Sequence, residues 1–377
     1  MEFNKYPFEK LNDLLSGVKP NSEYSEILLT IGEPQFQTPQ NIKDALIASI
    51  DKLNKYPKSS GEIELKEAQT SYLKRRFGVD VSLEQLIPTF GTREVLFNFP
   101  QFFLSDKKSP KVAFVNPFYQ IYEGAAIASG AEVVYLNLEE QNGYKPTIDK
   151  EQLKDVDLVI LNTPSNPTAS VMSLDELKQW VELALEYDFL LINDECYIDI
   201  YSNEPIPSIL NASVEVGNSS FKNVLTLNSI SKRNSAPGLR SGFIAGDADI
   251  LKKYMRYRTY VGCASPLPLQ MAAVAAWSDD ESARGFREAY KENLEIASKI
   301  LNVQKPEATF YIWLKVDNAV ERAKELYEKY SVKVLPGEFL GREGAGVGYW
   351  RLALVYEPKV IKEAVERIKE FLGWMSR

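Results

Sequence analysis

The chain has 377 residues with a formal net charge of −8, and it is 45% hydrophobic and 25% charged, as is normal for a globular protein. Its length suits two lobes, and without a long basic block nucleic acid is not an expected partner. Two cysteines and no histidine exclude a disulfide framework, a Ser-His-Asp triad and a histidine-ligated zinc site. If the chain is an enzyme that works near neutral pH, a lysine of lowered pKa is the obvious group to move protons in place of histidine.

No apolar run approaches the roughly 18 residues that a membrane-spanning helix needs. The first residues, MEFNKYPFEKLNDLL, mix acidic and basic side chains and lack the apolar core of a signal peptide. We therefore expect a cytoplasmic protein with no membrane association and no metal site.

Short apolar runs alternate with helical patterns between about residues 111 and 247. The runs are KVAFV, AEVVYL, DLVILN, FLLIND, NVLTLNSI and RSGFIAG. They do not alternate strictly with polar residues, which is typical of strands buried on both faces. Residues 173–188 predict a helix that begins with a capping box of Ser173 and Glu176. This alternation indicates an α/β fold with a mostly parallel, helix-covered sheet.

The last hundred residues predict a smaller α+β lobe. Helical periodicity covers 287–301, 319–330 and 357–375, whereas 308–316 and 350–355 are typical of strands. The glycine-rich segment 341–350 predicts a loop.

Polar groups gather where several of these elements begin or end. Asp194 closes an apolar strand, and carboxylates at the carboxyl end of a parallel strand point into the crevice where α/β sheets bind ligands. Lys232 follows another strand, beside residues that bind phosphate well. Taken singly, each feature also has an ordinary explanation as a loop, an acidic turn or a surface charge. The complete set of such features comprises the loop LNTPSNPTAS (161–170), Asp194, Ser229, Ser231, Lys232, Arg240, the helix start Gly91-Thr92-Arg93, and Arg351.

In their order and spacing, these motifs resemble the class I/II aminotransferases, which are pyridoxal-phosphate enzymes of fold type I. The resemblance runs from TIGEPQFQTP (30–39) to WRLALV (350–355). It implies a large domain, 36–270, with a mostly parallel seven-stranded sheet covered by helices. An N-terminal arm, 1–35, and a smaller α+β domain, 271–377, complete the expected fold.

The resemblance also implies residue roles in a transaminase. Lys232 would hold the cofactor's aldehyde and act as the general base, and Asp194 would pair with the pyridine nitrogen. Asn166 and Tyr197 would bind the ring's phenolic oxygen, and Tyr119 would stack on the ring. The implied phosphate ligands are Ser229, Ser231, Arg240, the backbone of Gly91, Thr92 and Arg93, and Tyr56 from the neighbouring subunit of a homodimer with shared sites. The substrate's α-carboxylate would meet Arg351 and the backbone of Gly32, with Asn166 also near the substrate.

The segment RNSAPGLRSG after Lys232 is similar to that of the N-succinyldiaminopimelate aminotransferases of bacterial lysine synthesis. So are RTYVGCASPLPLQMAAVAAWSDD from Arg258 and LPGEFLGREG from Leu335. The chain departs from the family pattern at Ala169, where glycine is commoner, and at Val261, where those enzymes commonly carry histidine. The resemblance implies a transaminase for N-succinyl-LL-2,6-diaminopimelate with 2-oxoglutarate/glutamate as the acceptor pair.

Several alternatives stay open at this point. They are an aminotransferase for aspartate, an aromatic amino acid or LL-diaminopimelate, a pyridoxal-phosphate-dependent carbon–sulfur lyase, and a non-catalytic cofactor-sensing regulator. The regulator is the least favoured, because residues 1–30 are too few for a DNA-binding domain. The expected substrate carries further carboxylates beyond the one assigned to Arg351. Arg233 and Arg258 are candidates to bind them, although both could instead pair with local acids.

Overall fold

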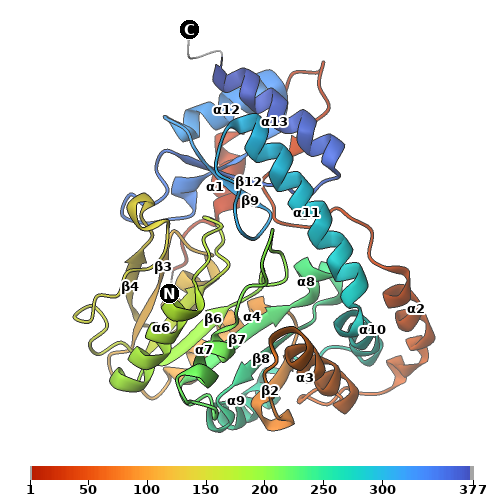
Figure 1. Ribbon diagram of the computed structural model, residues 1–377, viewed down its shortest axis with the longest axis vertical. Coiled ribbons are helices and arrows are strands. Elements are labelled where there is room, and N and C mark those ends of the chain that lie inside the picture. The colour runs from red at the N-terminus through yellow and green to blue at the C-terminus, as the bar shows by residue number, and fades with distance from the viewer. Residues whose placement is uncertain (1, 374–377) are drawn as a thin grey trace.

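The computed structural model describes residues 2–373 of the chain (Figure 1). Helices α1–α13 span Pro7–Leu14, Gln40–Ala48, Ile63–Phe77, Thr92–Phe103, Ile121–Ala128, Leu174–Tyr187, Ile209–Glu215, Ile230–Arg233, Ala248–Val261, Leu267–Ser278, Asp280–Leu301, Ala319–Tyr330 and Pro358–Gly373. Strands β1–β12 span Ile27–Leu28, Leu86–Thr89, Lys111–Asn116, Glu132–Asn137, Leu158–Asn162, Leu190–Asp194, Val224–Ser229, Gly242–Gly246, Tyr311–Lys315, Val332–Lys333, Leu335–Pro336 and Tyr349–Ala353.

A seven-stranded sheet in the order β2-β8-β7-β6-β5-β3-β4 forms the centre of the larger lobe. Only β8 runs antiparallel to its neighbours, β2 and β7, so the predicted mostly parallel sheet of the fold type I transferases is confirmed. All six predicted apolar runs form strands. The seventh strand, β2, has four residues including Pro88, and it lies at the edge of the sheet, where proline is tolerated.

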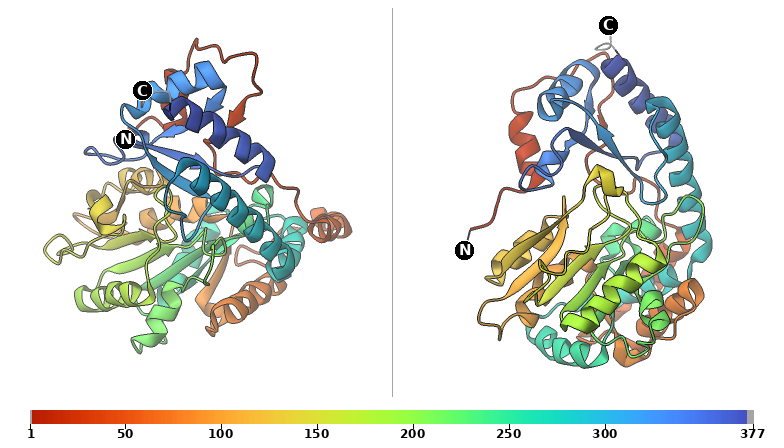
Figure 2. Two further views of the ribbon diagram at one scale, coloured as in Figure 1. Left: turned by 45° about the horizontal axis from the view of Figure 1, so that its top comes forward. Right: turned by 60° about the vertical axis from the view of Figure 1, so that its left-hand side comes forward.

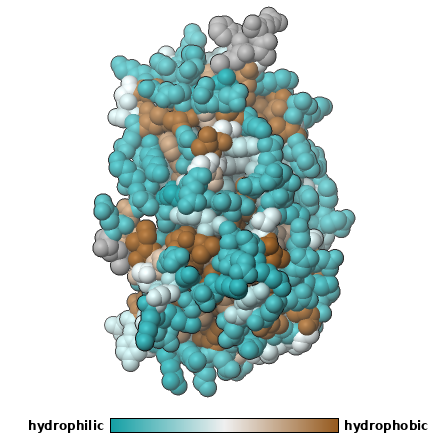
Figure 3. Space-filling model, turned by 90° about the vertical axis from the view of Figure 1, so that its left-hand side faces the viewer, coloured by the Kyte–Doolittle hydropathy of each residue, from teal (hydrophilic) through white to brown (hydrophobic). Residues whose placement is uncertain are grey.

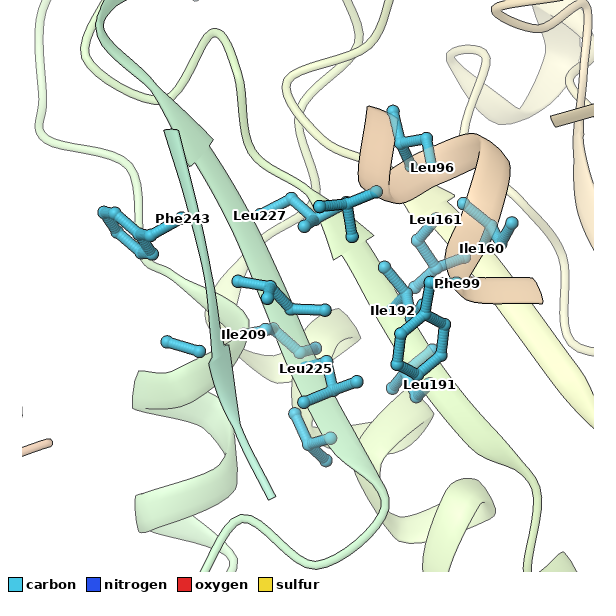
Figure 4. Close-up of a cluster of buried hydrophobic side chains, with 14 of the residues drawn as sticks. Leu96, Phe99, Ile160, Leu161, Leu191, Ile192, Ile209, Leu225, Leu227 and Phe243 are labelled. Atoms are coloured by element: carbon cyan, nitrogen blue, oxygen red, sulfur yellow. The ribbon is translucent and has the colours of Figure 1, made fainter. Parts of the chain in front are cut away.

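Helices cover both faces of this sheet, with α6 and α7 in front of it and α4 behind it in Figure 1. Leu96 and Phe99 of α4 pack onto Ile192 and neighbouring strand residues in a water-excluded cluster (Figure 4). The predicted capping box of α6 is present, because Glu176 N donates to Ser173 Oγ (3.3 Å) and Ser173 N donates to Glu176 Oε2 (2.6 Å). Each buried aliphatic or aromatic side chain of the cluster in Figure 4 contributes about 1.5–3 kcal/mol to folding.

The smaller lobe is built on an antiparallel sheet in the order β11-β12-β9, with α11, α12 and α13 packed around it. The N-terminal segment joins this lobe through β1, which pairs in parallel with β10. The 22-residue helix α11 runs from beside α10 at the large sheet up to α13 (Figures 1 and 2). It begins seven residues before the predicted start, because the Asp279 side chain accepts a hydrogen bond from Ser282 N and caps it.

The predicted strands 308–316 and 350–355 are present as β9 and β12, each shorter than predicted. The predicted C-terminal helix is present as α13, and its last two predicted residues, 374 and 375, lie outside the described residues. Within residues 2–373, no helix combines the length and the apolar character that crossing a membrane requires.

Two separate hydrophobic cores support the predicted division into two domains. The first core includes buried side chains from Ile42 to Trp277, and the second runs from Ile27 through the smaller sheet to Phe371. Because Trp277 belongs to the first core, we propose that the large domain extends through α10, slightly beyond the predicted limit of 36–270. The small domain, predicted as 271–377, would then begin with α11, and the arm keeps its predicted limits of 1–35.

Candidate active site

A pocket of about 660 Å³ lies where the carboxyl ends of β5, β6 and β7 meet the small-domain strands β9 and β12. This is the edge at which open α/β sheets bind ligands. Of the residues singled out from the sequence, those that line it are Gly32, Thr92, Arg93, Tyr119, Asn166, Asp194, Tyr197, Ser229, Ser231, Lys232, Arg240 and Arg351. Gly91 does not line the pocket but lies against Arg240, which does, and Tyr56 lies outside the pocket.

Lys232 sits on α8, a single helical turn that begins directly after β7. Ser229 ends the strand and caps the turn, because its Oγ accepts a hydrogen bond from Ser231 N (3.1 Å). The Lys232 amine enters the pocket and donates to Gly32 O. Burial, with the guanidinium groups of Arg351 and Arg240 nearby, lowers the pKa of Lys232 to about 8. An amine of this pKa can exchange protons near neutral pH.

Asp194 ends β6, is buried and lines the same pocket as Lys232. Burial raises its pKa, and hydrogen bonds to the carboxylate oppose that rise. Cys196 N donates to Oδ1 (3.3 Å), and the Tyr122 hydroxyl donates to Oδ2 (2.8 Å). Tyr122 was not predicted from the sequence. The one feature of the sequence that points to Tyr122 is its position three residues after Tyr119, at the start of α5.

Hydroxyl and guanidinium groups converge on one end of the pocket. Ser229 Oγ and Ser231 Oγ lie 2.9 Å apart, and Arg240 lies close to Gly91 at the start of α4. A Cβ atom at Gly91, whose φ is +71°, would stand 2.2 Å from Arg240 Nη2, so a side chain there would displace the guanidinium. Donors at a helix start combined with an arginine form a site suited to an anion such as phosphate.

Arg351 is a buried cation without a partner carboxylate among the described residues. Only 4% of the residue is exposed. Its guanidinium donates to Asn166 Oδ1 (2.7 Å) and to Thr30 O, whereas its Nε has no partner. Because a buried charge is costly unless it is paired, this group is set to receive a carboxylate from a ligand.

Two tyrosines complete the wall around Gly32. The hydroxyls of Tyr197 and Tyr311 lie 2.9 Å apart, and the Arg351 guanidinium lies over the Tyr311 ring at 4.6 Å. A Cβ atom at Gly32 would stand 2.0 Å from the Tyr311 hydroxyl, so only glycine fits there. Tyr311 was also not predicted, since the strand that carries it resembles any buried strand of a small domain.

Neither Arg233 nor Arg258 lines the pocket. Arg233 donates to Asp199 Oδ2 (2.7 Å) and to Asp280, and Arg258 donates to Glu94. Both arginines are buried. The structure therefore supports pairing with local acids, and the hypothesis that they bind substrate carboxylates is wrong for this arrangement.

Two further sequence features find a structural setting. Tyr56 is 99% exposed and lies outside the pocket of its own chain. Ala169 has a φ of +61°, a left-handed conformation that favours glycine. Glycine, which the sequence analysis noted as commoner at this position, would adopt the same turn with less backbone strain.

Comparisons with known proteins agree with this geometry. Residues 24–368 match the model of the family described as "Aminotransferase class I and II". The crystal structure of aminotransferase AspB from Helicobacter pylori is 48% identical, with a TM-score of 0.96, over 98% of this chain and 99% of that one.

Two curated relatives are similar over almost the whole chain. An LL-diaminopimelate aminotransferase from Natranaerobius thermophilus is 30% identical over 98% of this chain and 97% of its own length. An aromatic-amino-acid aminotransferase from Thermococcus litoralis is 28% identical over 98% of this chain and 96% of its own length. The chain therefore belongs to the class I and II aminotransferases and is a pyridoxal-phosphate-dependent transaminase.

Proposed function

We propose that the chain transfers the amino group of N-succinyl-LL-2,6-diaminopimelate to 2-oxoglutarate, a step in diaminopimelate and lysine synthesis. The observation that carries this proposal is the charge of the pocket. Its basic lining residues are Arg93, Lys232, Arg240 and Arg351, and its acidic ones are Glu94 and Asp194. Glu94 is already paired with Arg258. Such an excess of positive charge favours a substrate with several carboxylates.

The pocket residues fit pyridoxal phosphate. The cradle of Ser229, Ser231 and Arg240 suits a dianionic phosphate, and the Gly91 position has no room for a side chain beside it. Asp194 would hold a proton on the pyridine nitrogen by its negative charge. Tyr119 would stack on the ring, and Asn166 with Tyr197 would bind its phenolic oxygen.

When bound, pyridoxal phosphate supplies an aldehyde and an electron-withdrawing ring that takes up electrons from the substrate's α-carbon. Lys232 would hold the aldehyde, and its amine would serve as the general base for the proton on the substrate's α-carbon. Its lowered pKa leaves a useful fraction of the amine neutral near pH 7. Arg351 holds the α-carboxylate, and Gly32 leaves space for it beside Tyr311.

An aromatic amino acid is the second candidate donor. Phe8, Phe90 and Phe97 line the same pocket, so an apolar side chain would also find contacts there. The relatives named above include both a diaminopimelate and an aromatic-amino-acid aminotransferase. Arg93 favours the carboxylate-rich donor, because the cofactor and the α-carboxylate of either donor already engage the other basic lining residues.

We further propose a cytoplasmic homodimer in which Tyr56 reaches the neighbouring subunit's phosphate. Large apolar side chains are exposed close to Tyr56 in the sequence, at Ile47, Leu53 and Ile63. Figure 3 shows the side of the molecule away from α2, where apolar patches also interrupt a largely hydrophilic surface. Clusters of exposed apolar residues mark interaction surfaces. A tyrosine that is almost fully exposed in one chain is then explained by a place in the partner's site.

The substrate proposal is tested by a panel of amino donors. We expect succinyl-diaminopimelate and glutamate to discharge the absorbance of the bound cofactor rapidly, and Lys232→Ala to abolish this reaction because it removes the base. Stopped-flow absorbance measures each donor separately. Brisk reaction with phenylalanine and none with succinyl-diaminopimelate would overturn the substrate assignment while leaving the transaminase intact.

The shared site is tested by complementation. Tyr56→Ala and Lys232→Ala chains are each expected to be nearly inactive. After mixing and refolding, hybrid dimers contain one intact site, so activity should return to about a quarter of the wild-type value if chains pair at random. A fully active monomer in sedimentation, or no recovery despite hybrid formation, contradicts the shared site.

The pKa of Lys232 predicts a dependence of stability on pH. The folded-state pKa of about 8 lies below the ordinary value of 10.5, so the unfolded chain binds more protons between these values. The free energy of unfolding of the cofactor-free protein should therefore rise from pH 8 to 10.5 by up to about 3 kcal/mol relative to Lys232→Met. Below pH 8 the two curves should run parallel. Urea unfolding of both proteins measures this, and parallel curves throughout would show that burial does not depress the Lys232 pKa.

A further inference from the structure

The segment LPGEFLGREG (335–344) has no role in the proposed chemistry, although it carries one of the sequence resemblances described above. It runs from β11 through the 3₁₀ turn Gly337–Phe339 into the glycine-rich loop before β12. Beyond that turn, Leu340 and Arg342 contact the large domain. The contact is made at the end of β3 and the start of α5, the stretch that also carries Tyr119.

Arg342 makes a two-point ion pair across the domain boundary. Its Nε donates to Glu123 Oε1 (2.8 Å), and its Nη2 donates to Glu123 Oε2 (2.6 Å). The Glu123 side chain, in the first turn of α5, is only 9% exposed. Asn4 of the N-terminal arm also donates to Glu123 Oε2 (3.1 Å). Parallel donation from a guanidinium to a carboxylate fixes the orientation of the two groups as well as their distance.

Backbone hydrogen bonds reinforce the ion pair on both sides. Arg342 N donates to Asn116 Oδ1 (3.0 Å), and Asn116 Nδ2 donates back to Arg342 O (3.0 Å). Next to them, Phe118 N donates to Leu340 O (2.9 Å). Because Asn116 is fully buried, these bonds are shielded from water. The two domains are therefore joined here by a junction with a defined geometry.

The two domains that meet at this junction carry different parts of the active site. Every residue proposed to bind the cofactor belongs to the large domain. Arg351, the proposed ligand of the substrate's α-carboxylate, lies on β12 of the small domain, nine residues after Arg342. The distance between the cofactor site and the Arg351 guanidinium therefore depends on how the two domains are joined.

We propose that Arg342 is a positioning residue, whose ion pair with Glu123 holds the small domain where Arg351 can take the substrate's α-carboxylate. This inference rests on the proposed role of Arg351. It predicts that loss of the ion pair weakens the binding of substrates, which need both domains. The binding of the cofactor, which needs only the large domain, should be preserved.

A second ion pair between the same two domains provides a matched control. Lys315 of β9 pairs with Glu140 of the large domain (2.7 Å). Their side chains are 66% and 61% exposed, in contrast to the nearly buried Glu123. Exposed ion pairs contribute little to stability or geometry. Lys315→Gln therefore removes an interdomain ion pair without the expected loss of domain spacing.

The kinetic test compares substrate binding with cofactor binding. In Arg342→Gln, KM for every amino donor that the wild type accepts should rise by about tenfold or more, with kcat less affected, because all donors share the α-carboxylate. The dissociation constant of pyridoxal phosphate, from absorbance titration of the apoenzyme, should stay within about twofold of the wild-type value, because the ion pair makes no hydrogen bond to a proposed cofactor ligand. Arg342→Lys should restore part of the KM, and Lys315→Gln should change neither quantity.

Hydrogen exchange tests the junction without turnover. The Phe118 amide, which is bonded across the boundary, should exchange at least about tenfold faster in Arg342→Gln than in the wild type, whereas amides of the central strand β6 should keep their rates. Glu123→Gln preserves the volume of the side chain and leaves the more exposed partner charged. It should give the same pattern, and it serves as the second variant if Arg342→Gln does not fold.

Two results would overturn the inference. The first is an unchanged KM and an unchanged Phe118 exchange rate in both variants. The second is a loss of cofactor affinity as large as the rise in KM, because the ion pair would then support the large domain alone. Failure of the wild type to react with any amino donor would instead contradict the proposed function, and the exchange measurement would still test the junction.

Discussion

Buried positive charge without a matching carboxylate is the constraint on which this site depends. Arg351 is almost fully buried, and Lys232 and Arg240 share its pocket, in a chain whose overall charge is −8. Elsewhere the chain pairs its buried cations with acids, as Arg233 does with Asp199 and Arg258 with Glu94. The cost of leaving charges unpaired is offset when anionic ligands bind, so the pocket is stabilised by its cofactor and substrate.

The sheet brings these charges together through the ends of its parallel strands. Asp194 and Ser229 end the adjacent strands β6 and β7. Lys232 lies in α8, the single helical turn that directly follows β7. Arg233, the last residue of that turn, pairs with Asp199 (2.7 Å), and Asp199 also pairs with Arg76 (2.8 Å), so these ion pairs anchor the turn. Although burial raises the pKa of Asp199, the two guanidinium groups hold it below the ordinary value. The paired arginines thus position the unpaired lysine.

The sequence predicts the parts of this arrangement that depend on local patterns. Apolar runs reveal six of the seven strands, and polar residues at their ends reveal Asp194 and Lys232. The edge strand β2 escapes because it is short and contains Pro88. The Tyr122–Asp194 hydrogen bond joins residues 72 positions apart, and the ion pair of Arg258 with Glu94 joins residues 164 positions apart. Such pairings depend on tertiary packing, which no local pattern encodes.

The central claim is that Lys232 is the lysine that holds the cofactor. Borohydride reduction of the holoenzyme followed by peptide mapping tests it most directly, because reduction fixes the pyridoxyl group on the amine that carries it. We expect the label on the peptide that contains Lys232, and no label in Lys232→Ala. A label on any other lysine of the wild-type protein would contradict the account.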